Sequence, residues 1–107
     1  MFDENQTTGH TVTGTGEVPV AELTGVLSAL ADPMRLAIVR LLAEGGSRPC
    51  GSFGLPVSKS TLTHHFRVLR EAGLIEQRDE GTRRLTSLRR AEIEERHPGL
   101  IDCILRR

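Results

Sequence analysis

Residues 58–73 hold the side chains best suited to contact a charged partner. On a helix, this stretch has one apolar face, formed by Leu62, Phe66 and Leu69. The opposite face is rich in hydrogen-bond donors, and no acidic residue occurs before Glu71. The donors are Lys59, Ser60, Thr61, Thr63, His64, Arg67 and Arg70. Such a helix can pack by its apolar face and place its donors in the major groove of double-stranded DNA.

The boundaries of this helix have local signals. Ser58 stands where an N-cap belongs, and Gly73 stands where a C-terminal glycine belongs. Residues 74–88 follow as two strand-like runs around a turn that contains glycine, which predicts a β-hairpin. We expect the hairpin to contact phosphate or the minor groove through Arg78, Arg83 and Arg84 near its tip.

Composition sets limits on the class of protein. The chain has 107 residues, which suggests one small domain, and it contains neither Trp nor Tyr, which gives no support for stacking on single-stranded bases. No apolar run is long enough to cross a bilayer, and two cysteines do not make a disulfide framework, so we expect a cytoplasmic protein without a membrane partner. Net charge is zero, but residues 59–90 hold eight basic side chains against four acidic ones. The positive charge is therefore local.

Helices are expected on both sides of this centre. Residues 1–16 lack periodicity and predict a disordered tail, whereas residues 18–31 have helical apolar spacing. A second helix begins at Asp32-Pro33, an N-cap followed by a proline at the first helical position, and ends at Gly45-Gly46. Residues 47–57 predict one short helical turn around positions 51–53.

Two further helices are predicted after the hairpin. Residues 89–96 read as a charged helix, and Pro98 opens a short apolar one. The apolar terminal helices suggest a two-fold dimer that would hold two DNA-reading helices one turn of DNA apart. The candidate interface residues are Val20, Leu23, Leu27, Leu100, Ile101 and Ile104. The predicted fold is mainly α with a small β-hairpin, a dimeric winged helix-turn-helix domain over residues 17–107.

Two motifs resemble a known family. The run LADPMRLAIVRLL at 30–42 resembles the opening of the ArsR/SmtB family of bacterial winged-helix repressors, and STLTHHFRVLREAGLI at 60–75, preceded by Ser58-Lys59, is similar to its recognition helix. The resemblance covers roughly residues 20–88. It implies a homodimeric repressor that binds a palindromic operator and is released by an inducer. It places Ser58 and His65 at the DNA end as well, although a role in buttressing the helix stays open for His65.

The identity of the inducer is open. Metal-sensing relatives carry Cys-x-Cys near the position of Cys50, but here Gly51-Ser52 follows. His97, Asp102 and Cys103 lack the spacing of the family's terminal-helix ligands. Adjacent histidines on a helix diverge by about 100°, so a zinc pair from positions 64 and 65 would chelate poorly. We predict no metal site and no cofactor; a small-molecule inducer, or metal or thiol-redox sensing by cysteines pooled in a dimer, remains an alternative.

Other function classes fit less well. No paired carboxylates, Cys/His pair or glycine-rich phosphate loop occurs in a suitable context, so an enzyme is not predicted. The zero net charge and the acidic residues Asp79 and Glu80 near the hairpin tip keep a second reading open, a winged helix that binds protein instead of DNA.

Overall fold

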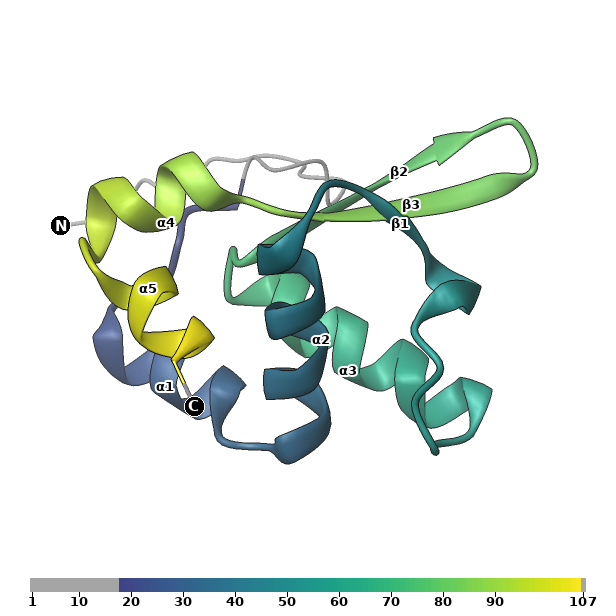
Figure 1. The fold of residues 1–107 in the computed structure, drawn as a ribbon, viewed down its shortest axis with the longest axis horizontal. Coiled ribbons are helices and arrows are strands. Elements are labelled where there is room, and N and C mark those ends of the chain that lie inside the picture. The colour runs from purple at the N-terminus through teal and green to yellow at the C-terminus, as the bar shows by residue number, and fades with distance from the viewer. Residues whose placement is uncertain (1–17, 107) are drawn as a thin grey trace, which may run out of the picture.

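The computed structural model describes residues 18–106, so the predicted tail at 1–16 lies outside the described residues. Its helices gather around α2 and α3, and a β-hairpin extends from them toward one end of the molecule (Figure 1). The elements are α1 (Leu23–Leu30), α2 (Pro33–Glu44), β1 (Arg48–Pro49), the 3-10 turn η1 (Cys50–Ser52), α3 (Lys59–Glu71), β2 (Ile75–Glu80), β3 (Arg83–Leu88), α4 (Arg90–Arg96) and α5 (Leu100–Leu105).

The caps predicted for α2 and α3 are present. One carboxylate oxygen of Asp32 accepts hydrogen bonds from the backbone N–H groups of Met34 and Arg35, at 2.9 and 3.1 Å. The Ser58 hydroxyl accepts one from the N–H of Thr61 at 3.2 Å. Each cap satisfies donors that the first helical turn leaves without intrahelical partners. The two central helices therefore begin where the sequence predicts.

The first helix is shorter than the predicted range of 18–31. It begins at Leu23, and the N–H of Ala21 donates to the carbonyl of Ala72 at 2.9 Å. The residues before α1 therefore run past the end of α3, where Gly73 has a φ of +76°. A Cβ at Gly73 would overlap the carbonyl of Pro19, so this close approach requires glycine.

The hairpin is confirmed, and the structure adds a strand to it. The sheet has the order β1-β3-β2 with both pairs antiparallel. Gly81 has a φ of +65° at the first of two loop residues, as a two-residue hairpin turn with glycine in this position requires. The extra strand pairs Arg48 with Thr86 and Pro49 with Leu85. It anchors η1, which occupies almost the predicted position, to the base of the hairpin.

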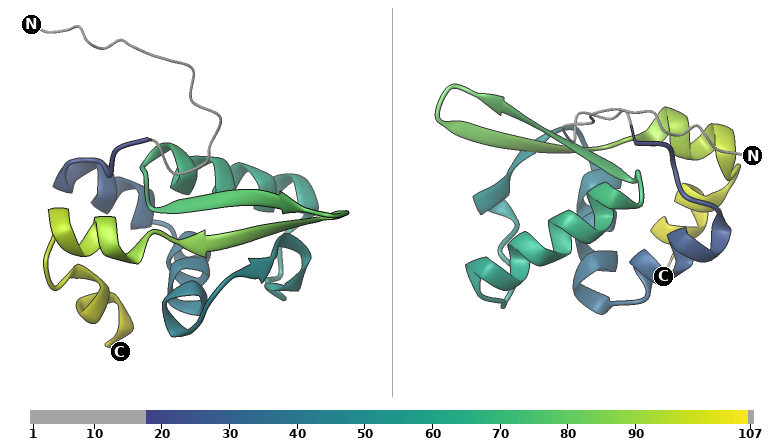
Figure 2. Two further views of the ribbon diagram at one scale, coloured as in Figure 1. Left: turned by 90° about the horizontal axis from the view of Figure 1, so that it is seen from above. Right: turned by 180° about the vertical axis from the view of Figure 1, so that it is seen from behind.

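One hydrophobic core joins the helices to the base of the sheet. Its fully buried aliphatic side chains are Val26, Ile38, Val39, Leu69, Leu74, Ile75 and Ile93. The views agree that α1, α4 and α5 lie at the end of the molecule opposite the hairpin tip (Figure 2). No helix within residues 18–106 is long and apolar enough to cross a membrane.

The core corrects part of the predicted dimer interface. Val20, Ile101 and Ile104 are buried by their own chain and Leu100 is half-buried, so these residues have little side-chain surface to offer a partner subunit. Leu23 and Leu27, by contrast, are each 51% exposed on α1. They lie four residues apart and therefore share one helical face.

Candidate nucleic-acid interface

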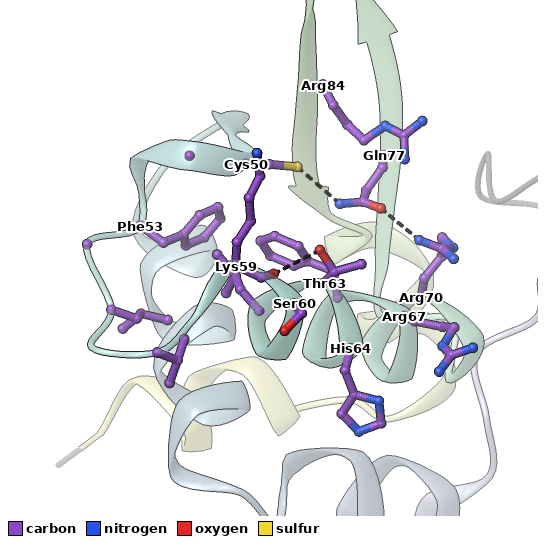
Figure 3. A pocket seen from close by; sticks show the side chains of 16 residues that line it. Cys50, Phe53, Lys59, Ser60, Thr63, His64, Arg67, Arg70, Gln77 and Arg84 are labelled. Carbon is purple, nitrogen blue, oxygen red and sulfur yellow. Dashed lines mark hydrogen bonds between the residues drawn. The ribbon is translucent and has the colours of Figure 1, made fainter.

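The first two and a half turns of α3 present a set of exposed donors on one side of the helix. Lys59, Ser60, Thr61, Thr63, His64 and Arg67 are all exposed. The side chains of Lys59 and Arg67 have no hydrogen-bond or ion-pair partner among residues 18–106. In Figure 3, His64 points from α3 to the side away from the strands. These groups are thus available to an external acceptor.

Two hydroxyl groups on this surface also serve the helix itself. Ser58 donates to the Thr61 hydroxyl at 2.9 Å in addition to capping α3. The Thr63 hydroxyl donates to the carbonyl of Lys59 at 3.0 Å. Both oxygens retain lone pairs, but their protons are engaged within the chain. Lys59, Thr61, His64 and Arg67 consequently keep donors that are not engaged within the chain.

His65 corrects the prediction that it contacts DNA. Its side chain is only 7% exposed, and its Nδ1 lies 3.2 Å from Nη1 of Arg35. Guanidinium is only a donor, so Nδ1 is the acceptor in this contact, and Nε2 faces the Asp32 carboxylate at 3.8 Å. Position 65 follows Leu62 by three residues and precedes Leu69 by four, which places it on the apolar face. That spacing is a signal from which the burial could have been predicted.

A buried polar cluster connects α3 to the sheet, and the sequence did not reveal it. Arg70, which is half-buried, donates to the Gln77 side-chain carbonyl at 2.8 Å. The Gln77 amide donates to the Thr86 hydroxyl at 3.0 Å and to the Cys50 sulfur at 3.3 Å. Arg70 was predicted to contact DNA, but in this structure its guanidinium is directed to the sheet (Figure 3). The cluster sets the position of the hairpin relative to α3.

The hairpin is less basic than its three exposed arginines suggest. Arg78, Arg83 and Arg84 share β2 and β3 with three acidic residues, Glu76, Asp79 and Glu80. Arg84 donates to the Asp79 carboxylate at 3.0 Å. This hydrogen bond raises the pKa of the Arg84 guanidinium above its ordinary value. The three positive charges of the hairpin are therefore balanced by three negative ones on the same two strands, whereas Lys59 and Arg67 on α3 have no acidic partner among the described residues.

A cleft of about 750 Å³ opens between α3, η1 and the base of the hairpin. Phe53 and Phe66 meet there edge to face, with ring centroids 5.3 Å apart. The cationic side chains that line the cleft are Lys59, Arg67, Arg70 and Arg84 (Figure 3). One wall of the DNA-facing surface is thus hollow and partly apolar.

The cysteines are separate in the fold. Cys50 is half-buried beside Thr86 and Gln77, and Cys103 is exposed on α5. Among the described residues, no group of three or more His, Cys, Asp or Glu side chains has the arrangement of a metal site.

Comparison with known proteins identifies the same architecture. A helix-turn-helix domain family matches residues 30–78. The HTH-type transcriptional regulator YceK of Bacillus subtilis is 35% identical over 82 residues, which are 74% of this chain and 82% of YceK. The putative arsenical resistance operon repressor ArsR of Halobacterium salinarum is 43% identical over 60 residues, 53% of this chain and 46% of that protein.

Solved structures match a larger share of the chain than the helix-turn-helix domain family does. The transcriptional repressor BigR from Xylella fastidiosa superposes with a TM-score of 0.64 at 26% identity, over 77% of this chain and 81% of that one. An ArsR-like transcriptional regulator from Rhodococcus sp. RHA1 gives a TM-score of 0.63 at 26% identity, over 76% of this chain and 77% of its own. With the donor-bearing α3 beside a β-hairpin, these relationships show that the chain belongs to the ArsR/SmtB family of winged helix-turn-helix transcriptional regulators.

Proposed function

We propose that this protein represses transcription as a homodimer that reads a palindromic operator with α3 and leaves it when an inducer binds. The observation that carries the proposal is the exposed face of α3, where Lys59 and Arg67 have no partner among the described residues. Lys59, Thr63 and Arg67 follow one another at four-residue spacing, so they form one row along the helix. A row of this kind fits the major groove, where base edges and flanking phosphates offer acceptors.

The second half of the proposal is a two-fold symmetric dimer. Leu23 and Leu27 are the exposed large apolar side chains of the described residues, and both belong to α1. Pairing α1 with its copy would cover both leucines at a self-complementary interface. It would also fix the spacing of the two α3 helices, which a palindrome requires to be about 34 Å, one turn of DNA.

The DNA half is tested by fluorescence anisotropy with duplexes from the region upstream of the protein's own gene. We expect binding that weakens as salt increases, because each neutralised phosphate releases counterions and contributes a slope of about −0.9 in log K against log salt. K59A and R67A should each weaken binding by about 1–3 kcal/mol if the side chain contacts a base edge, or reduce the slope by about one if it contacts phosphate.

Arg96 on α4 provides the matched control. It is an exposed arginine at the end of the molecule opposite the hairpin tip, so R96A should leave both affinity and salt slope unchanged. Affinity that does not respond to salt, or that is unchanged in the K59A/R67A double variant, would contradict DNA reading. It would favour the alternative that this winged helix binds protein.

The dimer half is tested by light scattering on the chromatographed protein. The wild-type mass should be that of two chains, and L23E/L27E should shift it to one chain because carboxylates would be buried at the interface. A91E places one carboxylate on an exposed position of α4 and should leave the mass at two chains. A wild-type mass of one chain at micromolar concentration would refute the two-fold.

A further inference from the structure

The cleft between α3, η1 and the hairpin base has walls of two kinds. Phe53, Leu55, Leu62 and Phe66 give it an apolar side. Phe53 and Phe66 are each 5% exposed and are held edge to face, so this side is a fixed part of the core boundary. Its volume of about 750 Å³ lies in the ~300–1,000 Å³ range of small-molecule sites.

The polar side of the cleft is cationic. Lys59, Arg67, Arg70 and Arg84 line it, and no Asp or Glu is among the residues that line it. Lys59 and Arg67 have no counter-ion among residues 18–106, and Arg70 donates only to the neutral amide of Gln77. Only Arg84 has an acidic partner, Asp79, and that pair is exposed. The field in the cleft therefore favours an anion.

These two walls select for one chemical class. A duplex phosphate would satisfy the cations but would leave the aromatic and aliphatic wall without a partner. An apolar molecule would cover that wall but would leave the cations unpaired. A molecule with a flat apolar body and one carboxylate satisfies both, because buried apolar area and a charge-assisted hydrogen bond then act together.

We propose that this cleft binds an organic carboxylate with an aromatic or acyl body, and that such a ligand competes directly with DNA. Lys59, Thr63 and Arg67 belong both to the lining of the cleft and to the row assigned to the major groove. A ligand seated there occupies donors that the operator needs. The competition rests on the proposed function, whereas ligand binding itself is measured without DNA.

Binding is tested by isothermal titration calorimetry with 2-naphthoate, with its neutral isostere 2-naphthamide and with sulfate. We expect one site for each chain, with 2-naphthoate about tenfold tighter than 2-naphthamide, the difference that one charge-assisted hydrogen bond provides. Sulfate should bind at least tenfold more weakly than 2-naphthoate, because it cannot use the apolar wall. Equal affinity for the two naphthalene compounds, or for sulfate and 2-naphthoate, would overturn the proposal.

Two variants separate the two walls. R84Q removes one exposed cation and should weaken 2-naphthoate about threefold while leaving 2-naphthamide unchanged. L55A shortens a half-buried wall residue and should weaken both compounds to the same extent. R96Q removes an exposed cation far from the cleft and should change neither; an effect equal to that of R84Q would mean general charge attraction and would refute the site. Far-UV circular dichroism and the urea midpoint confirm that each variant is folded.

Competition is tested by anisotropy with increasing 2-naphthoate. A competitor raises the apparent Kd for DNA in proportion to its concentration without limit, whereas a plateau would show a ternary complex and would overturn direct competition. The two proposals fail separately. If the protein binds DNA but not 2-naphthoate, the proposal of a repressor stands and the proposal of a carboxylate site in the cleft is refuted. If it binds 2-naphthoate but not DNA, the carboxylate site stands and the proposal of a repressor is refuted.

Discussion

The hydrogen bond between Arg35 and His65 makes a quantitative prediction about how α3 is held. Arg35 lies on α2. Its Nε donates to the carbonyl of Ala29 at 2.6 Å, and its Nη1 donates to Nδ1 of His65 at 3.2 Å. One guanidinium thus joins the end of α1 to the middle of α3. Because His65 is only 7% exposed, its Nδ1 has little access to water if the bond is lost.

The magnitude follows from the chemistry of the two groups. A hydrogen bond to a charged donor contributes about 1.5–3 kcal/mol, and Arg35 is half-buried, so water can partly replace the lost acceptor. We therefore expect a coupling free energy near the low end, about 1.5 kcal/mol. H65L keeps the apolar volume and removes the acceptor, while R35M keeps the stem and removes the donor. R35M also removes the hydrogen bond to the carbonyl of Ala29, but the double variant lacks this bond too, so its contribution cancels in the coupling free energy.

The assay is a double-mutant cycle in urea with four proteins. H65L should lower the urea midpoint by roughly 1 M for an m-value of about 1.5 kcal/mol/M. R35M alone should lower the midpoint by more than H65L does. The double variant should be more stable than the sum of the single losses by the coupling free energy. H64L is the control, since its ring is exposed on the same helix and should be additive with R35M. A coupling below about 0.3 kcal/mol for Arg35 and His65 would refute the reasoning.

Three further predictions follow from the caps, the glycines and the hairpin. Hydrogen bonds from the backbone N–H groups lower the pKa of the Asp32 carboxyl below its ordinary value of 3.8. The stability that the ionised carboxylate contributes is therefore present above pH 3.8 and is lost as the pH falls through the pKa of the folded state. D32N, an equally good cap without a charge to titrate, should lose less free energy of unfolding between pH 6 and 2.5 than the wild type does. G73A should lower the free energy of unfolding, measured by urea titration, by more than about 2 kcal/mol, because the new Cβ meets the carbonyl of Pro19. G81A, at a similar φ but in open space, should lower it by only about 1–2 kcal/mol. Equal losses for the two variants would contradict the close approach at Gly73. D79N frees the arginine opposite it on the hairpin and should strengthen DNA binding and steepen its salt slope; an unchanged slope would mean that the hairpin does not contact phosphate.

What could be predicted from the sequence was what depends on near neighbours. Asp32 and Ser58 each cap a helix through atoms two or three residues away, and both helices begin as predicted. The apolar spacing of α3 and the glycine in the hairpin turn are equally local. Caps, periodicity and turns are encoded within one or two turns of chain, so they could be identified without a structure.

What could not be predicted depends on residues far apart in the chain. The two-residue strand β1 contains a proline and exists only because β3 pairs with it. Arg89 reads as a surface charge, yet it is 6% exposed and donates to the carbonyls of Val18 and Gly73. Arg89 satisfies backbone acceptors where three segments meet, and no local sequence pattern predicts this role.

The partial success at the candidate DNA surface has the same physical origin. Exposed donors such as Lys59 and Arg67 could be predicted because amphipathic spacing alone places them outward. The sequence shows Asp79 and Glu80 near the arginines of the hairpin tip, but the pairing of Asp79 with Arg84 depends on the register of the hairpin. Register decides that the arginines of the hairpin are partly neutralised, and this moves the main electrostatic role to α3.

The hydrogen bonds of His65 and Arg70 therefore matter for recognition as well as for stability. A roll of α3 by 20° would move side-chain tips, at a radius of about 5–6 Å, by about 2 Å, which exceeds the ~0.5 Å range of good hydrogen-bond distances. Apolar contacts alone restrain such a roll weakly, because several packings of similar volume have similar energy. His65 and Arg70 lie five residues apart, about 140° around the helix, so their bonds to Arg35 and Gln77 restrain the roll from two sides. In the proposed complex Arg35 and Gln77 thus set the readout without touching DNA.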